Sequence, residues 1–256
     1  MPDISISLVP GSAPRQLSAA ELAAVRDSRR RPRRTQFDYL HARRVVDDLA
    51  ARLRRVEQPV RDALDVWCGS RPYEDLLPAG VRWTGFDVPD NPYGVADVVS
   101  AEFLPFEDAS FDVVLCVEAF QWVRDPRHAV AEFRRVLRPG GTAIVTLPYA
   151  YEYDRTNFER RYTGNELVEL FEGWDAVELS ENGGRGVAWA VLTGSMLDHA
   201  VGRGRVAHAA WPLLAATYAT INAVGTVLAW VEDRHGPGSV AFPMNLMVAA
   251  RRPAGG

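Results

Sequence analysis

The chain has 256 residues, of which 47% are hydrophobic and 24% charged, a balance that is typical of a soluble globular protein and excludes global disorder. This length predicts a single domain of ordinary size with additions. The formal net charge is -4, so we expect no overall attraction to nucleic acid, although all 29 basic residues are arginine.

The N-terminus does not combine a charged segment with a following apolar run, so no signal peptide is predicted. The two cysteines, Cys68 and Cys116, both fall where core strands are expected to end. Neither belongs to a pair with metal-ligand spacing, and no metal site is predicted. We therefore expect a reduced, cytoplasmic protein.

Two helices are predicted before the first strand. Ser18 and Glu21 form a capping-box pattern that marks a helix start, and Pro32 predicts a break after this helix. The arginine-rich stretch Arg26–Arg34 indicates either a solvated linker or contact with an acidic surface, and we favour the linker. An apolar stripe then predicts an amphipathic helix over Phe37–Val56.

The stretch Ala63–Tyr73 combines a short apolar strand, the acidic Asp65 and a turn at Gly69, where the backbone is free to point its amides at a ligand. A second predicted strand, Val81–Val88, carries Asp87, 22 positions after Asp65. In doubly wound sheets this offset places a carboxylate within reach of ribose hydroxyls. The turn lacks the three glycines of a dinucleotide site, so a nucleotide diphosphate is not the favoured ligand.

Strands and helices alternate along the rest of the chain. The further predicted strands are Val95–Val99, Phe111–Val117, Thr142–Leu147, Trp174–Leu179 and the closing Met244–Ala250. A helix is predicted from Asp125 to Leu137, where Arg138-Pro-Gly-Gly141 stops it. This alternation implies a parallel, right-handed, doubly wound sheet that binds ligands at the carboxyl ends of its strands.

Five motifs follow one another in a set order. They are Asp65-Val-Trp-Cys-Gly69, Asp87, Leu104-Pro-Phe106, Ser110-Phe-Asp-Val-Val-Leu115 and Leu137-Arg-Pro-Gly-Gly141. In order and spacing they resemble the class I S-adenosylmethionine-dependent methyltransferases, in the broad small-molecule branch called type 11, over about residues 60–180. The resemblance implies an α/β, Rossmann-like sheet of seven mostly parallel strands with the last antiparallel, and S-adenosylmethionine as cofactor. It also implies methyl transfer to a small molecule, which we expect to accept at a hydroxyl or a carboxylate.

The resemblance further implies which residues face the cofactor. They are Asp65, Trp67, Gly69, Asp87, Ser100, Ala101, Glu102, Cys116, Val117 and Trp122. Ser100 stands where relatives commonly carry an aspartate that accepts from the adenine amino group. Trp67 stands where the family has glycine, and three outcomes are open. The indole turns into the core, lies over the sulfonium in a cation–π contact, or fills the pocket and leaves a scaffold protein without turnover.

Aromatic and acidic side chains follow the fifth predicted strand. We interpret Tyr149, Tyr151 and Asp154 as candidates to line the acceptor site, and the alternative is a polar surface loop with aromatic anchors. The histidine that a related subgroup carries in this loop is missing, so His199 is the candidate base, against a structural or solvated histidine. Methyl transfer is an in-line displacement, which mainly requires alignment and exclusion of water.

The C-terminal part contains an uncharged segment. Residues 207–231 are 25 positions without Asp, Glu, Lys or Arg, of which 18 are apolar. The length permits a membrane span, but polar residues and abundant alanine favour a buried helical insertion at about residues 195–235, and no membrane contact. We expect this insertion either to cover the acceptor pocket or to form a homodimer interface. Gly183, Gly184 and Gly186 predict a flexible turn before it. The expected organisation is an N-terminal helical segment over residues 1–59 and a methyltransferase domain over residues 60–256.

Overall fold

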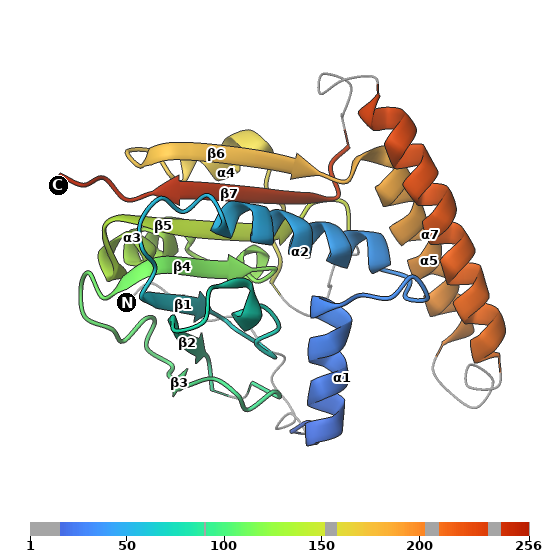
Figure 1. The fold of residues 1–256 in the computed structure, drawn as a ribbon, viewed down its shortest axis with the longest axis horizontal. Helices are drawn as coiled ribbons and strands as arrows, with labels where there is room; N and C mark the ends of the chain where they lie inside the picture. Colours follow the sequence, from blue (N-terminus) through green and yellow to red (C-terminus); the bar gives the residue numbers. More distant parts are fainter. Residues whose placement is uncertain (1–15, 90, 152–157, 203–209, 235–241, 256) are drawn as a thin grey trace.

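The structure is a computed structural model that describes residues 16–89, 91–151, 158–202, 210–234 and 242–255. Its described strands form one sheet in the order β3-β2-β1-β4-β5-β7-β6, with helices on both faces (Figure 1). The strands are β1 Asp62–Val66, β2 Arg82–Asp87, β3 Val98–Val99, β4 Phe111–Val117, β5 Leu137–Pro148, β6 Asp175–Asn182 and β7 Asn245–Arg251. The helices are α1 Ala19–Arg30, α2 Tyr39–Leu53, α3 Pro126–Val136, α4 Gly164–Glu169, α5 Gly184–Val201 and α7 Trp211–Asp233, with short 3-10 turns at Glu74–Leu76 and Phe120–Trp122.

The predicted Rossmann-like α/β sheet is confirmed. The pairs that join β3, β2, β1, β4 and β5 are all parallel, whereas β7 runs antiparallel between β5 and β6. The closing strand is therefore antiparallel, as expected. The assignment of residues 1–59 to a separate N-terminal segment stays a prediction.

The central strands are apolar on both sides because helices cover both faces of the sheet. All five residues of β1 are buried, and six of the seven residues of β4. On one face Leu49 of α2 packs in a cluster with Val113 and Leu115, and on the other Phe133 of α3 packs in a cluster with Val114. A parallel sheet that is covered twice requires such unbroken apolar strands.

The capping box at the start of α1 is confirmed. The Glu21 amide donates to the Ser18 hydroxyl at 3.3 Å, and the Ser18 amide donates to the Glu21 carboxylate at 2.9 Å. The expectation of a solvated arginine linker holds for only part of the stretch. Arg31, Arg33 and Arg34 are exposed after the end of α1. Arg26 and Arg30 instead belong to α1 and reach other segments, Arg26 at the carbonyl of Ser70 and Arg30 at Asp75.

Several predicted boundaries are corrected. Strand β3 is only two residues long, and β5 begins at Leu137, so the Pro-Gly-Gly sequence after it lies inside a strand. Gly184 and Gly186 do not form a flexible turn, because the chain is helical from Gly184 onward. The carboxylate of Glu232 accepts from the amides of Arg185 and Gly186, and this contact from another helix stabilises the helix start that the glycines leave without a side-chain cap.

The helical insertion is a pair of helices, α5 and α7, which lies beyond the edge of the sheet where the parallel strands end (Figure 1). It begins at Gly184 rather than near residue 195. The expectation that it is buried is wrong for α7, whose buried residues are Tyr218, Asn222, Gly225 and Ala229. By length and composition α7 is able to cross a membrane, and 22% of its most apolar 18-residue window is buried.

Small residues allow the two helices to approach closely. A Cβ atom on Gly225 would lie 2.5 Å from the Cβ of Ala190, and one on Gly186 would lie 2.5 Å from the backbone nitrogen of Ala229. Asn222 anchors the pair, because its side-chain amide donates to the carbonyls of Arg34 and Gln36 at 2.9 and 2.8 Å.

We expect Gly225→Val to destabilise the protein by about 1–3 kcal/mol, because the added atoms collide with α5. The control is Ala23→Val, which adds a valine at an exposed position of α1. Urea denaturation followed by circular dichroism measures both. Equal unfolding midpoints for the two variants would show that close approach of the helices does not constrain the fold.

Candidate active site

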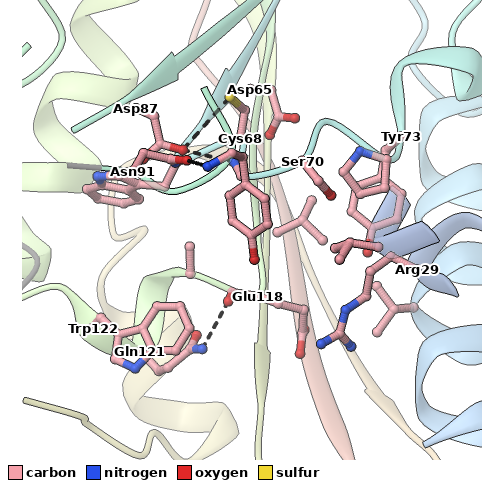
Figure 2. Close-up of a pocket in the computed structure, with 18 of the residues that line it drawn as sticks. Arg29, Asp65, Cys68, Ser70, Tyr73, Asp87, Asn91, Glu118, Gln121 and Trp122 are labelled. Atoms are coloured by element: carbon pink, nitrogen blue, oxygen red, sulfur yellow. Dashed lines mark hydrogen bonds between the residues drawn. The ribbon is translucent and has the colours of Figure 1, made fainter. Parts of the chain in front are cut away.

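A cavity of about 720 Å³ lies where β1, β2, β4 and β5 end, and α1 and α2 close it from the other side. This volume falls within the range of about 300–1,000 Å³ that is usual for small-molecule sites. Figure 2 shows Asp87 and Asn91 at one end of the cavity and Arg29 and Tyr73 at the other. The cavity is therefore at the edge of the sheet where doubly wound folds bind their ligands.

The turn after β1 is tied to the end of β2 by one carboxylate. Asp87 accepts from the amide of Gly69 at 2.9 Å and from the amide of Val88 at 2.9 Å (Figure 2 draws the first of these). Gly69 has a φ of 53°, in the left-handed region that glycine adopts without strain. Burial raises the pKa of Asp87, and the hydrogen bonds from Gly69 and Val88 oppose this shift.

Asp65 is a buried acid that faces the cavity without a partner for one of its oxygens. Its side chain is 2% exposed, and its Oδ2 has no hydrogen-bond partner among the described residues. Burial raises the pKa of Asp65 to about 8, and the charge of Asp87 adds to this shift while Arg71 opposes it. Burial therefore favours the neutral form of this carboxyl, and a ligand can supply the missing partner.

Trp67 also has a left-handed backbone, with a φ of 55°. Its indole is 7% exposed and stacks on Phe103 with ring centres 5.2 Å apart. The ring therefore packs into the core and forms part of the cavity wall. The cavity keeps its volume of about 720 Å³ beside this side chain, which does not support the alternative in which Trp67 fills the pocket.

A polar cluster lies at the end of β4, on the far side of the cavity from Asp87. The Nε2 atom of His41 lies 3.0 Å from Oε2 of Glu118, and Oε1 of Glu118 accepts from the Thr146 hydroxyl at 2.9 Å and from the Asn245 amide at 2.5 Å. Burial acts to raise the pKa of Glu118. The charge of His41 and these hydrogen bonds outweigh burial, and the pKa lies below its ordinary value. Glu118 is thus a carboxylate at neutral pH.

The predicted cofactor residues separate into two groups. Those that line the cavity are Asp65, Trp67, Gly69, Asp87, Val117 and Trp122. The others are placed elsewhere: Cys116 is buried in the core, and Ser100, Ala101 and Glu102 lie outside the cavity lining, where the Ser100 hydroxyl accepts from the Glu102 amide.

The predicted acceptor-site residues are also divided. Tyr151 lines the cavity, and its ring lies 5.4 Å from that of His41. Tyr149 packs against the core, and His199 is exposed in the last turn of α5, outside the cavity lining. Asp154 lies outside the described residues.

Other cavity residues were not predicted from the sequence. They include Arg29, His41, Tyr73 and Asn91. Arg29 belongs to the arginine-rich stretch for which contact with an acidic surface was the alternative. His41 carried a second signal, because it falls between Leu40 and Ala42 on the apolar side of α2, where a titratable side chain is unusual.

The fold is that of the class I methyltransferases. It has their sheet order, their single antiparallel strand and acidic side chains at the ends of β1 and β2. Residues 64–145, about a third of the chain, match the family described as "Methyltransferase domain". This stretch matches the methyltransferase family, and the described residues have the class I methyltransferase fold.

Relatives of known sequence and structure agree with this class. An uncharacterized methyltransferase of Mycobacterium tuberculosis is 50% identical over 50 residues, which are 20% of this chain and 20% of that protein. The ubiquinone biosynthesis O-methyltransferase of Methylococcus capsulatus is 35% identical over 99 residues, 33% of this chain and 42% of the relative. The crystal structure of the cyclase SpnF has a TM-score of 0.53 at 19% identity, over 82% of both chains. The chain thus spans less than half the length of these sequence relatives, and the structural likeness is one of fold.

We expect Asp65→Asn to flatten the pH dependence of stability. Folding raises the pKa of Asp65 to about 8, so the folded protein keeps a proton that the unfolded chain releases above about pH 4. The contribution of Asp65 to the free energy of unfolding therefore falls as the pH rises from about 4 to about 8, and is level above that. Urea midpoints across this range measure the difference between variant and wild type. Asp175→Asn, on the exposed start of β6, is the control, and an identical slope in wild type and Asp65→Asn would contradict the assignment.

Proposed function

We propose that the protein transfers a methyl group from S-adenosylmethionine to a small-molecule acceptor, at a hydroxyl or a carboxylate. The observation that carries this proposal is that the matched methyltransferase domain ends its strands at one cavity, between two acidic side chains and a polar cluster. The name of the ubiquinone O-methyltransferase relative supports an oxygen acceptor. The SpnF likeness shows that the fold also serves other chemistry, so binding and turnover are the tests.

The residues of the cavity fit the cofactor. Asp87 lies at the end of β2, where such folds hold ribose hydroxyls, and Gly69 leaves its backbone open to close approach. The unpartnered oxygen of Asp65 offers a further polar contact. When bound, S-adenosylmethionine supplies a methyl group on a positively charged sulfur. The chain's own task is to align the acceptor and exclude water, for which Tyr73, Trp122 and Tyr151 provide aromatic walls.

We expect wild-type protein to bind S-adenosylmethionine and S-adenosylhomocysteine in calorimetric titrations, and not NAD. Asp87→Ala should weaken binding by about tenfold or more, because a hydrogen bond to a charged group contributes about 1.5–3 kcal/mol. Asp175→Ala is the control. Trp67→Gly should bind no more tightly than wild type, because the indole packs on Phe103. If wild type binds neither adenosyl ligand and Trp67→Gly binds both, Trp67 blocks the site and a scaffold role replaces the enzyme.

We also propose a cytoplasmic location, supported by Cys68 and Cys116, which are both free and buried.

We propose that the protein is a homodimer through α7. Ten of the twelve exposed large hydrophobic side chains of the described residues lie on α5 and α7. At a rise of about 1.5 Å per residue α7 is about 34 Å long, and with α5 beside it the apolar slab is about 20 Å wide. This area of about 700 Å² per partner is close to the ~800 Å² of a standard interface. A basic membrane-binding face is missing, because α7 carries no basic side chain before Arg234.

The exposed face of α7 suits a second copy of the same helix. Small side chains lie near its middle, with Ala216, Thr220 and Ala223. Larger ones follow toward its ends, with Leu213 on one side and Val224, Val227 and Trp230 on the other. Two crossing helices are closest at their crossing point, where small side chains fit, and they diverge toward their ends, where large side chains fill the gap. An antiparallel, two-fold pair of α7 helices therefore matches small to small and large to large.

We expect sedimentation equilibrium to find a dimer for wild type and a monomer for Ala223→Arg, because the arginine would bury a charge at the crossing point. Val99→Arg, which replaces an exposed valine on β3, should remain a dimer. A monomeric wild type, or binding of wild type to phospholipid vesicles that Ala223→Arg abolishes, would overturn this interface.

A further inference from the structure

The Glu118 carboxylate at the cavity has three side-chain hydrogen-bond partners among the described residues. Its side chain is 24% exposed and lines the cavity, while donors from three elements reach it: His41 from α2, Thr146 from β5 and Asn245 from β7. Thr146 is fully buried and Asn245 is 1% exposed. A buried polar side chain destabilises the fold unless it makes its hydrogen bonds. His41, Thr146 and Asn245 each make one to the Glu118 carboxylate.

The backbone at Glu118 is also unusual. Its φ is 55°, in the left-handed region that glycine occupies without strain and glutamate does not. The amide of Glu118 donates to the carbonyl and to the hydroxyl of Thr146, both at 3.0 Å, and these bonds hold the strained turn. Strain of this kind persists where the surrounding structure over-determines it, and it concentrates at functional sites.

The walls near Glu118 select the kind of molecule that can reach it. Tyr73, Trp122 and Tyr151 line the cavity and suit a flat apolar or aromatic body. Arg29 lines the same cavity, but its guanidinium pairs with Asp38 at 3.2 Å and so does not set the charge near Glu118. A cationic amine has no free electron pair to attack the methyl carbon until it loses its proton. An acceptor that is already an anion would be repelled by the carboxylate. A neutral hydroxyl instead has a proton that a carboxylate can accept in a hydrogen bond.

We propose that Glu118 is a catalytic residue that receives the proton of an aromatic or otherwise apolar hydroxyl acceptor, and that His41 is a positioning residue that keeps Glu118 ready for it. The proposal rests on the proposed methyltransferase function and names the acceptor class of the same site.

The proposed step balances. The acceptor oxygen forms a bond to the methyl carbon, the bond between this carbon and sulfur breaks, and the electron pair stays on sulfur, which becomes neutral. The hydroxyl proton passes to the Glu118 carboxylate, which becomes a neutral acid. A strong base is not required, because an oxygen that gains a methyl group while still protonated becomes strongly acidic. A positioned proton acceptor contributes about 10²–10⁴ in rate.

The test uses the full-length protein with S-adenosylmethionine and three probe acceptors: catechol for hydroxyls, benzoate for carboxylates and benzylamine for amines. Formation of S-adenosylhomocysteine measures turnover. We expect catechol to be methylated in preference to the other two, and Glu118→Gln to lower kcat on catechol by about 10²–10⁴ with binding of S-adenosylmethionine kept. Glu57→Gln, a mostly exposed glutamate that pairs with Arg251, is the matched control.

His41→Asn should change the pH profile rather than only the rate. The charged and titratable groups around Glu118 are His41 on α2, Arg29 on α1, Tyr73 before the 3-10 turn Glu74–Leu76, Cys116 on β4 and Tyr151 after β5. Without the charge and the hydrogen bond of His41, burial raises the pKa of Glu118. The carboxylate is the active form, so activity should be lost at low pH and recover as the pH rises, with its acid limb above that of wild type. Glu118→Gln should not recover at any pH.

The possible outcomes separate the role of Glu118 from the methyltransferase function. A Glu118→Gln variant with wild-type turnover, a preference for benzoate or benzylamine, or no turnover of catechol by protein that binds S-adenosylmethionine would each overturn the proposal. A His41→Asn variant that loses the same fraction of activity at every pH would show that His41 is only structural. Failure of wild type to bind S-adenosylmethionine would instead overturn the methyltransferase function itself.

Discussion

One partly buried carboxylate organises the site end of this molecule. Glu118 stands where β4 leaves the sheet, and a charge withdrawn from water must be matched by donors or it destabilises the fold. The donors come from α2, β5 and β7, so the helix over one face, a parallel strand and the antiparallel strand are all aligned to a single side chain. Removing one donor would leave the charge partly unmatched. The positions of these three elements around the cavity are therefore coupled.

At the other end of the cavity, one oxygen of a buried acid lacks a hydrogen-bond partner among the described residues. There Asp87 ties the turn after β1 to β2 through the amides of Gly69 and Val88, while Asp65 is left buried without a full set of partners. An incompletely satisfied group weakens the free protein, and a ligand that completes its hydrogen bonds recovers that free energy. The two ends together make a cavity with aromatic walls, two hydrogen-bonded acids, Glu118 and Asp87, and one acid, Asp65, that lacks a partner for one oxygen in the described part of the chain.

The helix pair α5 and α7 adds a small core cluster of its own, in which Val187 and Val191 of α5 pack with Leu40 of α2. Gly186 and Gly225 bring the two backbones together, and Asn222 anchors α7 to the connection between α1 and α2. Because the inner face is filled by these contacts, the large side chains that remain, such as Trp230 and Leu213, point away from the molecule. No residue of α5 or α7 belongs to the described lining of the cavity, so this surface and the cavity lie apart.

The sequence by itself determined the sheet, the order of its strands' motifs and the two acidic side chains after β1 and β2, because unbroken apolar runs and a glycine turn are local signals that tertiary context rarely overrides. It could not determine that Gly184 starts a helix, since the cap comes from Glu232, or that Ser100 lies outside the cavity. Nor could it show that His41 meets Glu118, 77 positions away. Only the tertiary structure decided these points, because hydrogen-bond partners and exposed faces depend on which distant segments are brought together.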